Sequence, residues 1–404
     1  MRNSMVAFAL MVVSTARLAS AAGLQVDTQQ ARATGMGTAV VASDNDASSI
    51  LYNPAGLAQG KGLELQLGDT LIAPAVRYID PTTGHSTVNH FGIVPPPHLY
   101  AAYGITDNLT VGFGEFTLYG NVLDYPTDSS WAGRFLITHS ELQTFDLNPT
   151  LAYRFLDGKL RVGAGFNAVR ATVDLARQLG FVDSEGSVEI AGATWGAGWN
   201  AGVQYEPFPQ FLMLGVSYRS TVKLNFDGNA HFSNIPPEFQ SQAYDQSGSA
   251  AIELPQLLSL GLALRPTDEL LIEFDADYTG WQTFHDISLV FADPANNQTE
   301  LKRWTHSWTF HLGGEYALSD RWHLRLGALY DETPSPEDTL GPDIPDASRL
   351  NLSAGIGFKF CDHFSIDAAY MQVIFLQSTS TLADLPGDYR ANANLVSLTL
   401  GYRP

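Results

Sequence analysis

The sequence predicts an all-β protein: a 14-stranded antiparallel transmembrane β-barrel that is plugged by a small N-terminal hatch domain. Three observations support this prediction. The first residues have the pattern of an export signal, apolar residues then recur at every second position in long runs, and short turns alternate with longer connections. The chain is therefore expected in the outer membrane of a Gram-negative bacterium.

The composition excludes several classes of protein. With 404 residues, of which 45% are hydrophobic and 16% charged, the chain has enough apolar surface for a folded core and is not disordered. Lys and Arg number 22 against 42 Asp and Glu, and the resulting charge of −20 repels nucleic acid and anionic lipid head groups. The single cysteine, Cys361, allows no internal disulfide and no cysteine-based zinc site. No nucleic-acid partner and no cofactor are expected.

Residues 1–21 are predicted to be a signal peptide. Arg2 opens a short basic head, residues 5–13 form an apolar run, and Ala19-Ser20-Ala21 offers the small residues at which a signal peptidase cuts. The apolar run is too short to span a membrane as a helix, which takes ~20 residues. The alternative is a plain amphipathic N-terminus.

Residues 22–60 lack the two-residue alternation and are predicted to form the hatch. They hold apolar side chains, Ile50 and Leu57 among them, which a flexible periplasmic tail would leave in water. The lumen of a 14-stranded barrel is wider than wall side chains alone can fill, so a segment folded inside it would bury these residues and close the pore. Within the segment stands a turn in which proline removes a donor and glycine permits a reversal, Asn53-Pro54-Ala55-Gly56.

Residues 61–404 are predicted to form the barrel. Apolar residues occupy every second position of residues 195–205 and 350–360, and glycine or polar residues lie between them. Runs of this length suit a tilted membrane strand of ~9–11 residues better than the shorter strands of a secreted sandwich or jelly roll, which is the alternative. Tyrosines near the ends of the apolar faces fit an aromatic girdle: Tyr205, Tyr218, Tyr278, Tyr316, Tyr330, Tyr370 and Tyr402.

Turn chemistry divides this region into strands. Six tight turns are expected at residues 106–108, 157–158, 207–209, 266–268, 319–320 and 362–363. Seven longer connections are expected near residues 85, 130, 182, 238, 296, 340 and 384. Short and long connections alternate strictly, which gives fourteen strands and places both termini on the periplasmic side.

The third strand, residues 109–118, carries Gly112 and Gly114 on the face opposite Leu109 and Val111. Glycines at these positions would permit a kink or bulge that interrupts pairing with the neighbouring strand. The alternative is that they relieve crowding on the inner face of the barrel, where other strands of this sequence also carry glycine.

Several stretches carry a resemblance to a known family: residues 46–57 (DASSILYNPAGL), 131–135 (WAGRF), 147–153 (LNPTLAY), 277–281 (DYTGW), 330–336 (YDETPSP) and 344–349 (IPDASR). Here the chain resembles the long-chain fatty acid transporter (FadL) family of outer-membrane proteins. The resemblance implies a 14-stranded barrel, a hatch bearing the Asn-Pro-Ala turn, and passage of hydrophobic molecules through an inward kink of the third strand that opens the wall sideways. The chain departs from the family at its end, Tyr402-Arg403-Pro404, where these barrels usually finish on an aromatic residue.

The expected function is a passive outer-membrane channel for hydrophobic compounds, with long-chain fatty acids as the first choice of substrate. Exposing an acyl tail to water costs about 0.8 kcal/mol per methylene, so a water-filled pore would carry it poorly. A transporter should offer apolar pockets, one or two cations for a carboxylate, and a lateral exit at the third strand.

Two sets of residues are candidate ligand contacts. The candidate cations lie at the loop ends of strands, where they could instead bind lipopolysaccharide: Arg134, Arg177, Lys302 and Arg303. The candidate apolar contacts are expected to form a landing surface between the second and third long loops, although some could belong to the aromatic girdle: Phe116, Leu118, Tyr119, Trp131 and Phe135.

Other functions stay open on the sequence alone. They are uptake of aromatic hydrocarbons or alkanes by the same route, a structural or adhesive barrel, and a general porin. Catalysis is not expected, because the sequence has neither a Gly-x-Ser-x-Gly elbow nor a P-loop. A metal site is not expected either, since His306 and His311 would face opposite sides of a strand. The chain is expected to act as a monomer.

Overall fold

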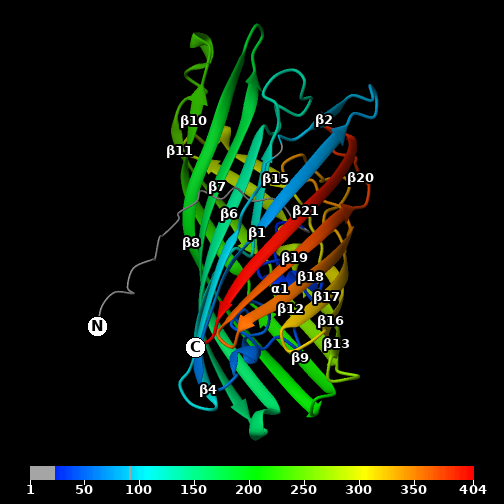
Figure 1. The fold of residues 1–404 in the computed structure, drawn as a ribbon. Helices are drawn as coiled ribbons and strands as arrows, with labels where there is room; N and C mark the ends of the chain where they lie inside the picture. The colour runs from blue at the N-terminus through cyan, green and yellow to red at the C-terminus, as the bar shows by residue number, and fades with distance from the viewer. Residues whose placement is uncertain (1–22, 91) are drawn as a thin grey trace, which may run out of the picture.

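The computed structural model describes residues 23–90 and 92–404, so the predicted signal peptide lies outside the described residues. The chain forms a closed antiparallel barrel around a buried N-terminal segment (Figure 1), which confirms the predicted fold class. Fourteen strands, three of them divided in two, make the wall. In chain order they are β1 (Gly62–Ile79), β3 (Pro97–Gly104), β4 (Leu109–Phe116) with β5 (Gly120–Asp124), β6 (His139–Phe155), β7 (Leu160–Gly180), β8 (Glu185–Phe208), β9 (Leu212–Arg219) with β10 (Val222–Ser233), β11 (Gln246–Leu254) with β12 (Leu257–Leu264), β13 (Leu270–Thr279), β16 (Ser307–Ala317), β17 (Trp322–Asp331), β18 (Arg349–Cys361), β19 (Phe364–Phe375) and β21 (Gly387–Tyr402).

The barrel closes between its first and last strands. β1 pairs with β21 from Leu65 opposite Tyr402 to Ile79 opposite Asp388. Closure leaves no long unpaired sheet edge, which is the condition for strands to lie in a membrane. Four short strands lie in the longer connections: β2 (Ser86–Val88), β14 (Asp286–Phe291), β15 (Gln298–Leu301) and β20 (Ser378–Ser380).

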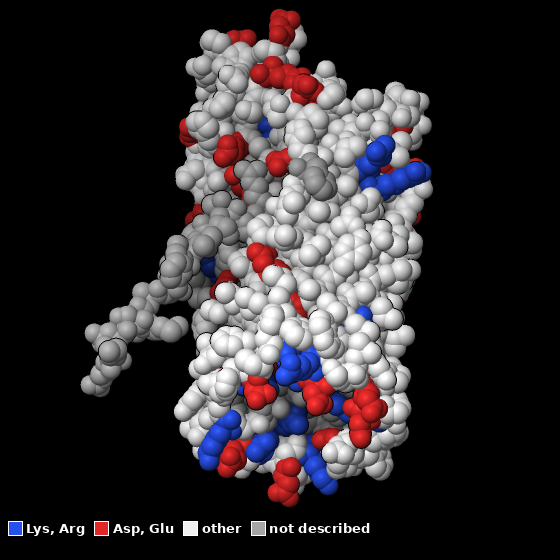
Figure 2. Space-filling view, in the orientation of Figure 1, with Lys and Arg blue, Asp and Glu red and all other residues white. Residues whose placement is uncertain are grey.

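The two-residue alternation separates an outer apolar face from an inner polar face. On β18, Leu350, Leu352 and Ile356 are exposed on the outside, whereas Asn351 and Ser353 are buried inside. Charged side chains of both signs gather instead at the lower end of the visible face (Figure 2). In the described ranges, no helix combines the length and the apolar character needed to cross a membrane.

The six tight turns fall where the sequence predicts them, between β3 and β4, β6 and β7, β8 and β9, β12 and β13, β16 and β17, and β18 and β19. The expected long connection near residue 182 is wrong. β7 and β8 stay paired up to Gly180 opposite Glu185, so four residues suffice to join them. Their alternation simply continues beyond the wall, and together with β10 and β11 they rise above the other strands (Figure 1).

Residues 23–60, called the hatch below, fold inside the barrel with α1 (Ala31–Gly35), α2 (Ser49–Tyr52) and the short 3-10 helix η1 (Pro54–Leu57). Asn53 begins η1: its side-chain oxygen accepts the N–H of Ala55 at 3.2 Å, and its amide nitrogen donates to the carbonyl of Val41 at 2.8 Å. A Cβ on Gly56 would collide with the carbonyl oxygen of Asp44, so only glycine fits there. The Asn-Pro-Ala-Gly turn therefore ties two parts of the hatch together.

Candidate functional site

A cavity of about 320 Å³ lies in the loop-side half of the barrel, above the hatch. Its volume falls in the range of small-molecule sites, roughly 300–1,000 Å³. The hatch residue Leu24 lines it together with apolar wall and loop residues: Leu142 on β6, Val173 and Leu175 on β7, Ile190 on β8, Phe226 on β10, Ala250 and Ile252 on β11, and Leu289 on β14. Such a lining suits an apolar ligand.

One end of the cavity is polar and holds a predicted cation. Arg177 on β7 lines it, and its guanidinium donates to Gln298 Oε1 at 3.2 Å and to the carbonyl of Phe135 at 3.5 Å. Glu300 and Asp343 line the same cavity. Because Arg177 is held mainly by neutral oxygens, its charge is available to an anionic group.

The other three predicted cations are engaged by acids. Lys302 is buried, and its Nζ lies 2.6 Å from both Glu300 Oε1 and Asp343 Oδ2. Burial alone would lower the pKa of Lys302, but these two carboxylates raise it above its ordinary value, so the ammonium stays charged. Similar pairs are made in the outer loops, by Arg134 with Glu185 at 2.8 Å and by Arg303 with Asp338.

The expected apolar landing surface is wrong for four of its five residues, which are buried: Phe116, Leu118, Tyr119 and Trp131. The ring of Trp131 stacks on Tyr125 with centroids 4.4 Å apart, and its N–H donates to the carbonyl of Ile137 at 2.8 Å. Phe135 is exposed, and the guanidinium of Arg134 lies 4.2 Å from its ring centroid. Large apolar residues between strands are therefore packing residues here, and their role as ligand contacts stays a prediction.

The third strand of the wall is interrupted at residues 117–119, called the strand break below. Side chains of β6 replace the missing ladder: the hydroxyl of Thr144 accepts the N–H of Tyr119 at 3.1 Å and donates to its carbonyl at 2.7 Å. The N–H of Leu118 donates to the carboxylate of Asp146. On this side the break is held by polar side chains that the sequence supplies at alternate, inward-facing positions.

The hatch pairs with the strand break from inside the barrel. Residues 24–29, called the hatch arm below, run beside it: Val26 N–H donates to the carbonyl of Leu118 at 2.7 Å, and Gly120 N–H donates to that of Leu24 at 2.8 Å. The side-chain oxygen of Gln29 accepts the N–H of Thr117 at 3.3 Å. The arm thus takes the place that a neighbouring wall strand would normally hold.

The predicted kink at Gly112 and Gly114 is misplaced. Both glycines keep continuous pairing with β3 and with β6, and the interruption follows Phe116. A Cβ at Gly112 would lie 2.7 Å from Leu57 Cδ2 and 2.9 Å from Ile50 Cδ1. These glycines therefore make room for the hatch, as the alternative account of them expected.

The segment that precedes β3 faces the strand break without closing the wall. Pro95, Pro96 and Pro97 have no backbone N–H to donate, and β3 begins only at the last of them. Above them, Val94 bridges to Ile72 of β1, and His90 donates to the carbonyl of Asp124 at 2.8 Å. Because the three prolines cannot donate backbone hydrogen bonds, few such bonds join the wall between β1 and β5.

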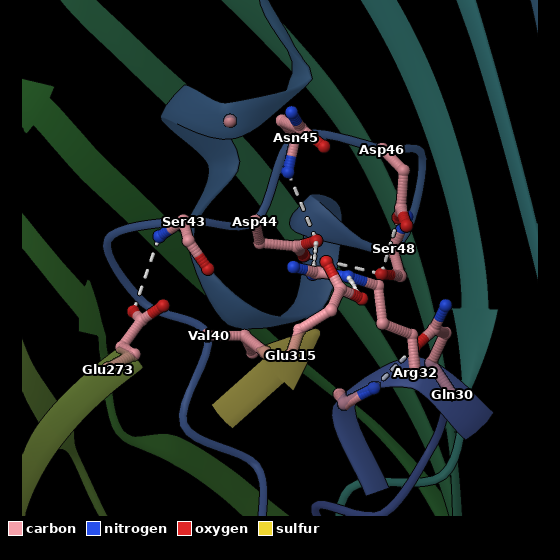
Figure 3. Close-up of polar contacts among 12 residues, drawn as sticks. Gln30, Arg32, Val40, Ser43, Asp44, Asn45, Asp46, Ser48, Glu273 and Glu315 are labelled. Carbon is pink, nitrogen blue, oxygen red and sulfur yellow. Dashed lines mark hydrogen bonds and ion pairs between the residues drawn. The ribbon is translucent and has the colours of Figure 1, made fainter. Parts of the chain in front are cut away.

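Two wall carboxylates that the sequence analysis did not select hold the hatch. Asp275 Oδ2 accepts the N–H groups of Val40 and Val41 at 2.7 and 2.9 Å. Glu273 Oε1 accepts those of Ala42 and Ser43 at 2.6 and 3.2 Å, and Figure 3 shows the contact with Ser43. Both acids lie on the inner face of β13, so one strand receives four successive hatch amides.

An ion-pair network adds a second anchor for the hatch. Arg32 on α1 lies 3.2 Å from Glu315 Oε2 of the wall and 3.5 Å from Asp44 Oδ1 within the hatch (Figure 3). Arg325 of β17 contacts the same Glu315 oxygen at 2.6 Å. Burial raises the pKa of Asp44 well above its ordinary range. Within residues 23–90 and 92–404, no group of three or more His, Cys, Asp or Glu could hold a metal ion.

A closed 14-stranded barrel, plugged from within and holding an apolar cavity, defines an outer-membrane transport channel for hydrophobic compounds rather than an enzyme. The chain belongs to the family described as outer membrane protein transport protein (OMPP1/FadL/TodX), whose sequence profile matches residues 12–403. Relatives of this family lie in the outer membrane of Gram-negative bacteria, and so does this chain.

Individual relatives and solved structures agree with this assignment. The chain is 30% identical to a long-chain fatty acid transport protein of Escherichia coli O6:H1, over 91% of this chain and 90% of the relative. It is 29% identical to a 47 kDa outer membrane protein of Pasteurella multocida, over 99% and 98%. A FadL homologue of Pseudomonas aeruginosa has the same fold, with a TM-score of 0.85, 21% identity and coverage of 94% and 99%. The Pseudomonas putida toluene transporter TodX follows with a TM-score of 0.73, 17% identity and coverage of 93% and 98%.

Proposed function

We propose that this chain carries long-chain fatty acids across the outer membrane by passive diffusion. The observation that carries the proposal is the apolar cavity with Arg177 at its polar end, which matches an acyl tail and its carboxylate. After capture at the loops, the tail occupies the cavity and the carboxylate contacts Arg177. The ligand then displaces the hatch arm that lines the cavity floor through Leu24.

The exit in this proposal is lateral, at the strand break. Transfer of an acyl tail into the periplasm would expose each methylene to water at a cost of about 0.8 kcal/mol, whereas transfer into the bilayer keeps it in an apolar phase. The thin pairing between β1 and β5 and the replaceable contacts of the hatch arm with residues 117–119 support this route. No energy source is needed.

Uptake of labelled oleate by cells that lack their own fatty acid transporter tests the proposal. Cells carrying this chain should accumulate oleate, and Arg177→Gln should weaken its binding to the purified protein about tenfold, the loss of one charge-assisted contact. Arg303→Gln, which changes an exposed cation outside the cavity, is the matched control. Large ion conductance in planar bilayers without oleate uptake would show a porin instead and overturn the proposal.

Neutral hydrocarbons are the second candidate substrate, on one observation. Acids outnumber cations along the cavity: Glu141, Glu300, Asp343 and Asp384 line it with Arg177. An acidic surface repels a carboxylate and leaves an alkane or an aromatic hydrocarbon unaffected. Uptake of labelled hexadecane or toluene together with no uptake of oleate would favour this substrate class.

A further inference from the structure

Arg219, the last residue of β9, places its guanidinium deep inside the barrel beside the strand break. The side chain is buried, and its Cζ lies 5.4 Å from the ring centroid of Phe116, the residue that ends β4 immediately before the break. One guanidinium nitrogen, Nη2, donates to the carbonyl of Leu51 in the hatch at 3.2 Å. This arginine therefore lies between the hatch and the third strand of the wall.

The charge of Arg219 has no ion-pair partner. Among the described residues, no Asp or Glu oxygen lies within 4.0 Å of it, and its Nη1 has no hydrogen-bond partner. Other buried cations are treated differently: Lys302 and Arg325 each contact two carboxylates, and Arg349 contacts Asp331 at 2.5 Å. Burying a cation without an ion-pair partner costs free energy, so such a group points to a functional role.

Holding the hatch does not require this charge. Asn200 donates its side-chain amide to the neighbouring carbonyl of Ile50 at 3.2 Å, and Gln204 donates to that of Asp44 at 2.9 Å. Neutral amides on the adjacent strand thus make the same kind of contact that Arg219 makes to Leu51. The contact with the hatch therefore needs neither the positive charge of Arg219 nor its free Nη1.

We propose that Arg219 is a second head-group site, which binds the carboxyl group of a fatty acid after it has left the cavity. This inference rests on the proposed function and adds a step to it. With the carboxyl group on Arg219, beside Phe116, the acyl tail lies at the level of the strand break. The head group is then held inside the barrel while the tail leaves through the wall.

Asp146 completes the site from β6. One carboxylate oxygen accepts the N–H of Leu118, and the other, Oδ2, is buried without a partner. Its negative charge acts on Arg219 and opposes a second carboxylate. A carboxyl group that carries a proton can donate to Asp146 and accept from Arg219, whereas an alkyl sulfonate has no proton to donate. The pair therefore fits a carboxylic acid.

Arg219→Gln is the decisive variant, because glutamine can still donate to Leu51 as its neighbours do while the charge is lost. In proteoliposomes, transport of oleate should fall about tenfold, and transport of oleyl alcohol, which has the same tail and no carboxyl group, should stay at the wild-type level. Arg219→Lys should keep at least half of the oleate transport. Heat-modifiable migration in SDS gels and a wild-type ion conductance verify that barrel and hatch are intact.

The outcomes separate this site from the proposed function. Equal loss of oleate and oleyl alcohol transport in Arg219→Gln would assign Arg219 a structural role and overturn the inference, as would unchanged oleate transport. In either case the wild-type protein still transports oleate, so the proposed function stands. Wild-type protein that transports neither compound would overturn both. Equal transport of oleate and an alkyl sulfonate of the same length would exclude the part assigned to Asp146.

Discussion

Asp275→Ala removes the acceptor of two consecutive hatch amides. Asp275 is fully buried and receives Val40 and Val41 at 2.7 and 2.9 Å, so the variant leaves two buried N–H groups without an acceptor. A buried donor that loses its partner costs about 1–3 kcal/mol, which gives a weakening of about 2–6 kcal/mol for this part of the hatch. Since 1.4 kcal/mol is about a factor of ten, the population of displaced hatch should rise by roughly one to four orders of magnitude.

Ion conductance in planar bilayers measures that population directly. The wild-type channel should conduct little, and Asp275→Ala should show frequent large openings and faster protease cleavage within residues 37–43. Asp227→Ala, which removes an exposed carboxylate from the outer face of β10, is the matched control. If Asp275→Ala kept the conductance and the protease resistance of Asp227→Ala, the carboxylate would not be an anchor and the reasoning would fail.

Three further changes test other parts of the structure. Gly112→Val should overpack the hatch by about 1–3 kcal/mol and raise ion conductance. Gly314→Val, at a position where an added Cβ makes only an ordinary contact, should leave conductance unchanged. Thr144→Val removes the hydroxyl that holds both backbone groups of Tyr119 and should lower oleate uptake, with rescue by Thr144→Ser; equal uptake in all three proteins would contradict this. Burial raises the pKa of Asp346 to about 6, so the loop of residues 332–348 should gain about 1.4 kcal/mol between pH 8 and pH 5, seen as slower hydrogen exchange; Asp346→Asn should abolish this pH dependence.

The wall of the barrel could be predicted because its signals are local. Alternation with a period of two and turn residues at short intervals depend only on neighbours in sequence, and they located all six tight turns. The error near residue 182 has the same origin. A strand that continues past the membrane and a loop that follows it share the same residue types, and the length of pairing between β7 and β8 depends on both strands.

The site could be predicted only in part, because its contacts join distant residues. Arg177 was selected because it is a cation at the loop end of a predicted strand, and it lines the cavity. Phe116 and Tyr119 were taken for surface residues because the hatch that covers them lies about 90 positions earlier in the chain. Asp275, whose partner Val40 is 235 positions away, was not selected at all. The residues around a carboxylate on the inner face of the wall do not indicate which distant backbone group it will bind.

The hatch also imposes an order on how the molecule is assembled. Residues 23–60 precede β1, yet their partners Asn200, Asp275 and Ser353 belong to strands made much later. The seam that closes the cylinder joins β1 to β21 along 15 residue pairs. Because the partners of the hatch lie on strands around the whole wall, we expect the hatch to bind inside before this seam is complete.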